Sequence, residues 1–473
     1  MRRDELDFVL AAVKQSLKPY HDRFAANTRL PSRGRPKAEI LDEIRTMKEA
    51  EQATWHDGYA SGAVYHGDEE HMAFLDEVYA LNAELNPLHP DLWPRATRYE
   101  AEVVAMTASM LGAEQSPTDS VDGGVCGLVT SGGTESILTA IRCARDHARA
   151  ERGVTAPELL VPFTAHVAFD KAAQYFGLEL VRVPVDEEGK ADVAATERAI
   201  TDRTAAIVGS APSFPWGVID PIVELSELAR ARGIWFHTDA CLGGFVLPWA
   251  ERLGEPVPPF DLRLPGVSSV SADTHKFGYA AKGTSVVLFR NVHLRHYSYY
   301  TVSDWPGGLY NSPSMAGSRP GALSAEAWAA MLATGEDGYL DATRRILETT
   351  RRLRAGVAAI PELRLLGDSL FVVPFGCDAF DVYAVQDLMS ARGWSLNGLQ
   401  LPPALHLCVT LRTVQPGVAE RFLHDLEESV AELRENPGQG STMAPIYGLG
   451  RRIDTEVSLD DVLTGYLDLQ YET

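Results

Sequence analysis

Short apolar stretches alternate with helical runs from about Tyr99 onward, and this alternation limits the possible folds more than any other feature of the chain. The stretches that read as strands are residues 159–163, 180–183, 205–208, 234–236, 268–271 and 285–289. Strands that alternate with helices predict right-handed crossovers and a largely parallel sheet with helices on both faces. Ligands of such sheets bind in the loops that follow the carboxyl ends of the strands, so site residues are expected there.

The chain of 473 residues, with 45% hydrophobic and 23% charged residues, has the composition of a globular protein with two or three domains. Apolar residues at helical spacing between Leu6 and Leu17 predict that the first twenty residues form a short amphipathic helix. We predict an N-terminal helical segment at residues 1–95, a large domain at 96–322 and a small α+β domain at 323–473. The small domain should begin with one long helix at residues 324–360 and contain strands at 370–374 and 405–411.

The formal net charge of -22 and the pI near 5.0 argue against a nucleic-acid partner, which requires clustered Lys and Arg. They also disfavour adhesion to an anionic membrane, and no stretch reaches the ~18 consecutive apolar residues of a membrane helix. The five cysteines are scattered and form no C-x-x-C pair, so neither a metal site nor a disulfide framework is expected. We therefore expect a cytoplasmic protein without a membrane anchor.

A lysine and an aspartate each follow a predicted strand. Lys276 ends the motif Asp273-Thr274-His275-Lys276, and a desolvated lysine with a lowered pKa can condense with an aldehyde. Asp239 ends another strand, where its carboxylate could hold a pyridinium nitrogen protonated. Taken singly, a solvated loop lysine and a helix N-cap aspartate are the more common explanations.

Two further features lie at other strand ends. The segment Val129-Thr130-Ser131-Gly132-Gly133-Thr134-Glu135 reads as a strand end, a glycine turn and a helix start, where backbone N–H groups converge on a phosphate-sized site. A capping box would explain this segment equally well. His166, after the next strand, could stack on a planar ring, although a lone histidine there is more often structural.

Along the chain come, in order, the phosphate loop, the stacking residue, the acid and the lysine. In this order of features the chain resembles the fold type I enzymes that depend on pyridoxal 5'-phosphate. Within that group the chain is similar to the group II decarboxylase family. The resemblance implies an α/β fold with a mostly parallel central sheet. It also implies a set of cofactor contacts: Ser131, Gly133, Thr134 and His275 at the phosphate, His166 on the ring, Asp239 at the ring nitrogen and Lys276 at the aldehyde.

Longer motifs resemble the sphingosine-1-phosphate lyases in particular, over about residues 55–340. These motifs are SGAVY at 61–65, NPLHP at 86–90, THKFGYAAKG at 274–283, DWPGG at 304–308 and AGSRPG at 316–321. Because the membrane-spanning N-terminus of the eukaryotic enzymes is missing, the likeness is to the soluble bacterial type. The resemblance implies a homodimer with shared active sites, in which Gly317 and Ser318 reach the cofactor phosphate of the neighbouring subunit. The implied substrate pocket consists of Tyr65, Asn86, His89 and Lys282.

The activity implied is cleavage of the C2–C3 bond of a phosphorylated long-chain base, giving a long-chain aldehyde and phosphoethanolamine. A phosphate clamp would fix which bond stands perpendicular to the cofactor ring. Lys276 or Lys282 could relay protons and Tyr65 could stabilise developing charge, and the sequence does not rank them.

Two rivals stay open at this point. The first is an amino-acid decarboxylase of the same family, acting on glutamate or an aromatic amino acid, which would recruit a C-terminal arginine for the substrate carboxylate. Here Arg412 stands only at the end of the strand predicted at residues 405–411. The second rival is a non-catalytic protein that kept the fold, and the joint presence of Lys276, Asp239 and His166 argues against it.

Overall fold

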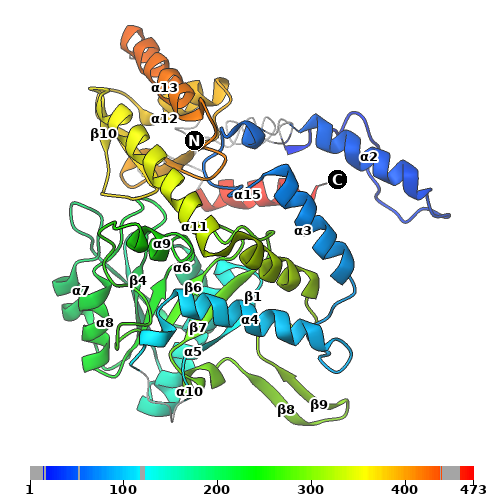
Figure 1. Cartoon of the computed structure of the whole chain (residues 1–473). Coiled ribbons are helices and arrows are strands. Elements are labelled where there is room, and N and C mark those ends of the chain that lie inside the picture. The colour runs from blue at the N-terminus through cyan, green and yellow to red at the C-terminus, as the bar shows by residue number, and fades with distance from the viewer. Residues whose placement is uncertain are drawn as a thin grey trace.

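The structure is a computed structural model that describes residues 14, 17–51, 54–117, 123–436, 438 and 459–472. The amphipathic helix predicted over the first twenty residues lies mostly outside the described residues; positions 14 and 17 are helical, whereas residues 18–20 are not. The larger of two main sheets lies in the lower part of Figure 1 and the smaller one in the upper part. Helix α11 (Gly321–Ala358) runs between them.

The larger sheet has seven strands in the order β1-β7-β6-β5-β4-β2-β3. They are β1 (Cys126–Thr130), β2 (Glu158–Pro162), β3 (Glu179–Val183), β4 (Thr204–Ser210), β5 (Trp235–Asp239), β6 (Ser269–Ala272) and β7 (Ser285–Phe289). The pairs β2–β3, β2–β4, β4–β5 and β5–β6 are parallel, which confirms the predicted mostly parallel sheet. Strand β7 is antiparallel to both neighbours because a loop, rather than a crossover helix, joins it to β6.

Side chains of the central strands point alternately to the two faces of this sheet. On β2, Leu159 and Val161 belong to one buried cluster and Leu160 to another. On β5, Trp235 and Phe236 divide between the same two clusters. Because both faces are buried, these strands are continuous apolar runs instead of alternating ones, which is typical of parallel sheets.

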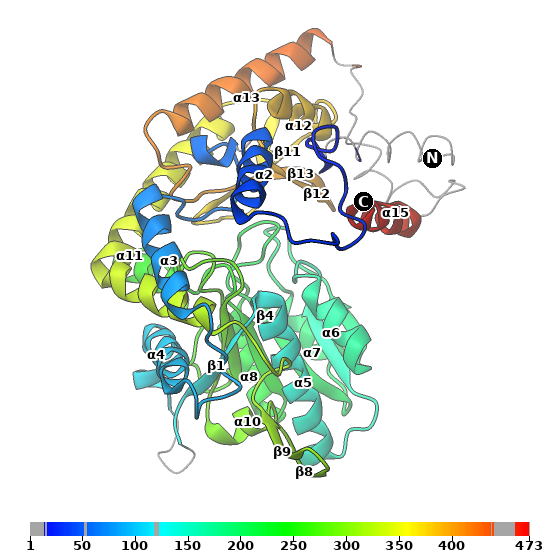
Figure 2. The ribbon, with the colours of Figure 1, turned by 90° about the vertical axis from the view of Figure 1, so that its right-hand side faces the viewer.

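Helices cover both faces (Figure 2). One cluster contains residues of α5 (Gly133–Arg152) and α6 (Ala168–Phe176), and the other contains residues of α8 (Ile222–Ala231) and α9 (Leu247–Arg252). The remaining helices around this sheet are α4 (Pro94–Met110), α7 (Val193–Ala199) and α10 (Val292–His296).

The smaller sheet is antiparallel, with the order β10-β11-β13-β12. Its strands are β10 (Leu363–Leu365), β11 (Val372–Cys377), β12 (Asn397–Gln400) and β13 (Pro403–Cys408), and the helices α12 (Val382–Ala391) and α13 (Val418–Glu435) accompany it. The strands predicted at residues 370–374 and 405–411 correspond to β11 and β13, each shifted by a few residues. The domain limits at residues 95 and 322 stay predictions.

Two elements differ from the sequence-based expectation. The predicted single long helix corresponds to α11, but the helix is interrupted at Gly335, whose φ of 59° and ψ of 176° are not helical. The hairpin of β8 (Tyr300–Trp305) and β9 (Gly308–Ser312) was not predicted, because most of its residues are exposed and show no apolar alternation. It projects away from the larger sheet (Figure 1).

The other elements are α2 (Lys37–Ala50), α3 (Glu69–Asn82), α15 (Leu459–Tyr471) and the 3-10 turns η1 (Thr54–Asp57) and η2 (Ala113–Gln115). Within the described parts of the chain, every helix is too short or too polar to cross a membrane.

Candidate active site

A cavity of about 390 Å³ opens where β1, β5 and β6 end. These strands point the same way, so their carboxyl ends meet at one edge of the sheet. Eight of the residues predicted from the sequence line this cavity: Tyr65, Ser131, Gly133, Thr134, His166, Asp239, His275 and Lys276. Residues that are far apart in the sequence therefore meet at this edge of the sheet, as their positions near strand ends predicted.

The Lys276 ammonium is paired with a carboxylate of its own loop. Its Nζ lies 2.8 Å from Oδ2 of Asp273, whose side chain is buried. Burial by itself lowers the pKa of Lys276, but the Asp273 carboxylate, with the Cys241 thiol and the Tyr65 hydroxyl, outweighs it and holds that pKa above its usual value. The expected lowering of the lysine pKa is thus wrong for this arrangement. Lys276 must lose a proton before it can attack an aldehyde.

The loop that carries Lys276 is held in an unusual conformation by two helices. Tyr279 has a φ of 63°, in the left-handed region that favours glycine. The ring Nε2 of His71 on α3 donates to the Tyr279 carbonyl at 2.8 Å, and the Tyr339 hydroxyl on α11 donates to the Gly278 carbonyl at 3.0 Å. Because these bonds come from outside the loop, they stabilise a backbone that the loop alone would not adopt.

Asp239 is buried at the end of β5, and it does not cap a helix. Its Oδ1 accepts from the Cys241 N–H at 3.0 Å and from the Ser271 hydroxyl at 3.3 Å, whereas the next helix begins only at Leu247. Among the described residues no donor reaches Oδ2 of Asp239. The hydrogen bonds to Oδ1 therefore orient the carboxylate, and Oδ2 is left to pair with a cationic group of a ligand.

The N-terminus of α5 has room for an anion. No side chain caps it. The capping box considered as the alternative is only half formed, because Glu135 accepts from the Ser131 N–H at 2.7 Å without the reciprocal bond. Gly132 has a φ of 152°. A Cβ at Gly133 would lie 2.7 Å from both carboxylate oxygens of Asp273, so only glycine lets this turn approach the lysine loop. Free N–H groups and the helix dipole favour a phosphate here.

His166 lies in the turn between β2 and α6, four residues beyond the end of the strand. Its Nδ1 accepts from the Ala168 N–H at 3.1 Å, which fixes the ring at the cavity wall. The ring also contacts Phe214 edge to face, with centroids 6.3 Å apart. A fixed imidazole on the wall can cover one face of a planar ligand.

His275 also lines the cavity, and its Nδ1 donates to the Thr284 carbonyl. Burial lowers the pKa of its ring, with the neighbouring lysines adding to the effect and Asp273 opposing it. The ring is therefore neutral near pH 7, with Nε2 as an acceptor.

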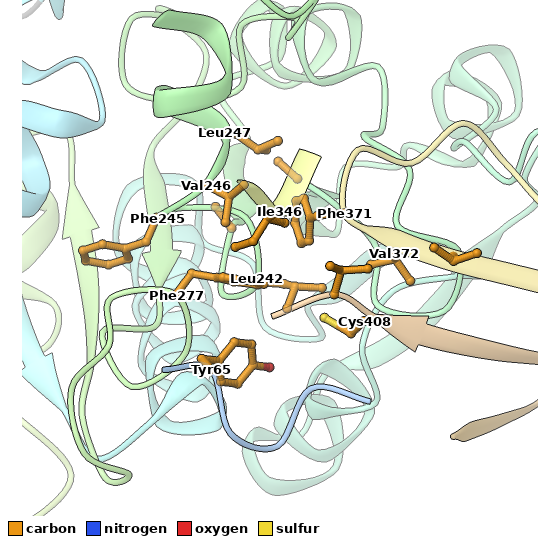
Figure 3. Packing of buried hydrophobic residues seen from close by; sticks show 14 of the residues in the cluster. Tyr65, Leu242, Phe245, Val246, Leu247, Phe277, Ile346, Phe371, Val372 and Cys408 are labelled. Carbon is orange, nitrogen blue, oxygen red and sulfur yellow. The ribbon is translucent and has the colours of Figure 1, made fainter. Parts of the chain in front are cut away.

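Tyr65 and Lys282 form one edge of the site. The Lys282 Nζ lies 4.7 Å from the centroid of the Tyr65 ring and donates to the His275 carbonyl at 3.2 Å. Partial burial of this amine, together with the charge of Lys276, lowers its pKa to about 8. Tyr65 packs edge to face on the buried Phe277, with ring centroids 4.7 Å apart, and lies beside the smaller sheet (Figure 3). Burial raises the pKa of its hydroxyl, which stays protonated at neutral pH.

Five predicted residues are not part of this cavity wall: Asn86, His89, Lys282, Gly317 and Ser318. The Asn86 amide donates to the Ser318 hydroxyl at 3.0 Å; Asn86 is half-buried and Ser318 is exposed. The His89 ring lies edge to face against Trp93, with centroids 6.4 Å apart. Within the single chain, the predicted residues therefore fall into those of the cavity wall and those outside it.

Sequence reasoning missed several residues of the cavity wall. Asp273 was quoted in the lysine motif without a role, although its position three residues before Lys276 places the two side chains within reach. Cys241 and Phe214 also line the wall. Buried Cys408 of β13 adds to the raised pKa of Tyr65 (Figure 3). Long-range neighbours such as Cys408 have no signal in the local sequence.

Comparison with known families agrees with this geometry. Residues 19–371 match the family model of the pyridoxal-dependent decarboxylase conserved domain. The solved glutamate decarboxylase of Lactobacillus brevis shares the fold, with a TM-score of 0.74 at 18% identity over 89% of this chain and 98% of that one. The fold and the site therefore define a pyridoxal-phosphate-dependent enzyme of the decarboxylase family.

More similar relatives narrow this class. The sphingosine-1-phosphate lyase of Arabidopsis thaliana is 47% identical over 92% of this chain and 79% of its own length. The solved sphingosine-1-phosphate lyase of Burkholderia pseudomallei is 45% identical, with a TM-score of 0.86 over 92% of this chain and 100% of that one. The chain belongs to the sphingosine-1-phosphate lyases.

The cavity residues fit pyridoxal 5'-phosphate, the cofactor of this family. The uncapped α5 N-terminus suits its phosphate, the free oxygen of Asp239 suits its ring nitrogen, and Lys276 suits its aldehyde. The buried Oδ1 of Asp273 has no hydrogen-bond partner among the described residues, as expected of a site that a bound group completes.

Proposed function

We propose that this enzyme cleaves the C2–C3 bond of phosphorylated long-chain bases, releasing a long-chain aldehyde and phosphoethanolamine. Beside its family membership, the observation that supports this most is the position of the Lys282 amine, next to Tyr65 and the Lys276 loop. A phosphorylated amine needs a local cation, since the chain as a whole carries a formal charge of -22.

The bound cofactor supplies an electron sink for the bond broken at the amine-bearing carbon. The protein residues supply the rest. Asp239 holds a positive charge at the ring nitrogen, His166 covers the ring, and Tyr65 donates to charge that develops on substrate oxygen. Loss of the proton from the C3 hydroxyl breaks the C2–C3 bond, and a proton then returns to C2. Lys276 and Lys282 are the amines near enough to the cavity to exchange these protons.

The decarboxylase alternative lacks its substrate-binding arginine in this structure. The Nη1 of Arg412 donates to the Gly67 carbonyl at 2.6 Å, and Arg412 is not part of the cavity wall. A substrate carboxylate would therefore find no guanidinium there. Product analysis by mass spectrometry, with phosphorylated sphingoid bases beside glutamate and aromatic amino acids, tests the choice. Carbon dioxide released from an amino acid, without aldehyde from a phosphorylated base, would refute the lyase proposal.

Replacing Lys282 with alanine should lower kcat/KM for a phosphorylated sphingoid base by about ten- to a hundredfold, the usual effect of losing one charge-assisted hydrogen bond. Cofactor occupancy should stay unchanged, because the α5 N-terminus, and not Lys282, is assigned to the cofactor phosphate. Steady-state kinetics and visible absorption measure the two quantities. Equal cleavage of phosphorylated and unphosphorylated bases by the wild type, or joint loss of cofactor and activity in the variant, would contradict the assignment.

The pH profile gives the same assignment a second test. An amine with a pKa of about 8 is charged below that pH and neutral above it, so kcat/KM should fall as the pH rises through that value. Lys282→Arg is the matched control, since its guanidinium stays charged and should move the fall to higher pH.

We propose further that the enzyme is a homodimer with shared sites, in which Gly317 and Ser318 reach the cofactor phosphate of the neighbouring subunit. Neither residue is part of the cavity wall of its own chain, which supports this proposal. His89 and Asn86 lie outside that cavity too, so we propose that they line the substrate pocket across the interface.

Subunit mixing tests the shared sites. Lys276→Ala subunits and Ser318→Asp subunits should each be inactive alone, because the second change puts a carboxylate beside the cofactor phosphate. Mixed dimers should regain activity, since one site then combines an intact Lys276 with an intact Ser318. No recovery in dimers shown to be mixed would mean that each site is built from one chain.

The five cysteines are all free; four are buried and Cys377 is half-buried. Free thiols are typical of a reducing compartment, which supports a cytoplasmic location as part of this proposal.

A further inference from the structure

A chain of buried hydrogen bonds lies beneath Asp239. The Trp235 indole Nε1 donates to the Ser269 hydroxyl at 2.8 Å, and that hydroxyl lies 2.8 Å from Nδ1 of His237. On the other side of the ring, Nε2 lies 3.2 Å from the Ser271 hydroxyl, which donates to Asp239. His237, Ser269 and Ser271 are each 0% exposed, so bulk solvent does not reach this chain of bonds. The mechanism described above uses none of these three side chains.

Only one direction of donation satisfies every group. The indole is solely a donor and the ionised carboxylate solely an acceptor, so the two ends are fixed. If Ser269 donates to Nδ1, the Nε2 proton of His237 can donate to Ser271, whose own proton goes to Asp239.

The reverse tautomer breaks this chain. With the proton on Nδ1, the Ser269 hydroxyl proton has no acceptor among the described residues. Ser271 would have to donate to Nε2 and would leave Asp239 with the Cys241 N–H alone. A buried carboxylate that loses a donor is destabilised in its ionised form, so the first arrangement is favoured.

We infer that His237 is a positioning residue for the reaction: held as the Nε2–H tautomer by Ser269, it orients Ser271 and so fixes the Asp239 carboxylate that faces the cofactor nitrogen. This inference rests on the role of Asp239 in the proposed function, and it does not depend on which substrate is cleaved. Bonds that all point the same way also polarise one another, which strengthens the last donor at the carboxylate.

The ring of His237 stays neutral, as this role requires. Burial lowers its pKa to about 4, and the attraction of Asp239 only partly opposes this. A neutral imidazole donates through one nitrogen and accepts through the other, whereas a protonated ring would donate through both and break the bond from Ser269. Its Nδ1 and Nε2 therefore have distinct and fixed roles.

Matched substitutions separate this role from simple packing. Glutamine places an amide N–H near the position of Nε2, and asparagine places its amide near Nδ1. His237→Gln should keep kcat within a fewfold of wild type. His237→Asn and Ser271→Ala should lower kcat on the order of tenfold or more at unchanged KM, and should shift the pH dependence of the visible absorption of bound cofactor. Ser271→Ala answers the question even where a His237 variant does not fold. Equal losses in the glutamine and asparagine variants, or unchanged kcat and absorption in folded Ser271→Ala, would overturn the inference.

Nitrogen NMR of the histidines in the cofactor-free protein provides a test without activity. His237, identified by its absence from the spectrum of a variant, should carry its proton on Nε2 and stay neutral well below the ordinary histidine range. A proton on Nδ1 would refute the inference. Because this measurement and the absorption titration use no substrate, they stand even if the proposed substrate is wrong.

Discussion

Lys276→Ala should abolish turnover, reducing kcat by several orders of magnitude, because no other amine of the cavity wall can bind the cofactor aldehyde. The wild-type protein should be yellow when purified, and the variant should lose the absorption of lysine-bound cofactor. The substitution should also affect the stability of the protein. Without its partner at 2.8 Å, the Asp273 carboxylate becomes a buried unpaired charge, so the variant should also be less stable.

Lys276→Arg separates these two effects. The guanidinium keeps a positive charge beside Asp273 but cannot condense with an aldehyde, so this variant should recover stability and stay inactive. Thermal unfolding and product formation are measured on wild type and both variants. Turnover by Lys276→Ala close to that of wild type would disprove the role of this lysine, whatever the stability.

The strand-end residues were predictable from the sequence because parallel strands share one edge. An apolar run followed by Asp239 or by the Lys276 motif locates a strand end, and a common direction then brings such ends together without knowledge of the strand order. The same reasoning places the glycine turn at Gly133 on that edge. The purely structural explanations were a helix cap at Asp239 and a capping box after Ser131. Only the hydrogen bonds of the structure distinguish these from a ligand site.

The protonation of the site was not predictable in the same way. The pKa of Lys276 depends on the direction in which Asp273 points, and that direction is a side-chain rotamer rather than a sequence pattern. The support of the loop by His71 and Tyr339 comes from helices that are remote in the sequence. Such contacts become visible only once the tertiary structure is known.

Unlike the strand-end residues, the residues known only from family resemblance do not all lie at the cavity. Tyr65 lines the cavity, and Lys282 lies beside Tyr65 without being part of the cavity wall, so their roles in the substrate pocket stay predictions. Ser318 and Asn86 bond to each other and are not part of the cavity wall, so the roles proposed for them require a second subunit. A pattern in one chain cannot indicate which subunit uses a residue, which is why the mixing experiment is needed.

Asp239→Ala should lower kcat by several orders of magnitude, because the carboxylate keeps the cofactor nitrogen protonated while negative charge develops at the substrate carbon. KM should change less, since the substrate phosphate is bound elsewhere. Alanine also leaves the Cys241 N–H and the Ser271 hydroxyl without their acceptor, at about 1 to 3 kcal/mol for each buried group. A loss of activity in this variant alone would therefore mix catalysis with stability.

Asp239→Asn removes the charge and keeps an oxygen for both donors, so it isolates the catalytic effect. We expect this variant to unfold close to the wild-type temperature, to bind cofactor and to share most of the kcat loss of Asp239→Ala. If the role of Asp239 were purely structural, Asp239→Asn should keep the kcat of wild type, because asparagine caps a backbone N–H about as well as aspartate does. Wild-type kcat in a folded, cofactor-loaded Asp239→Asn enzyme would therefore show that the charge at this position is not the partner of the ring nitrogen.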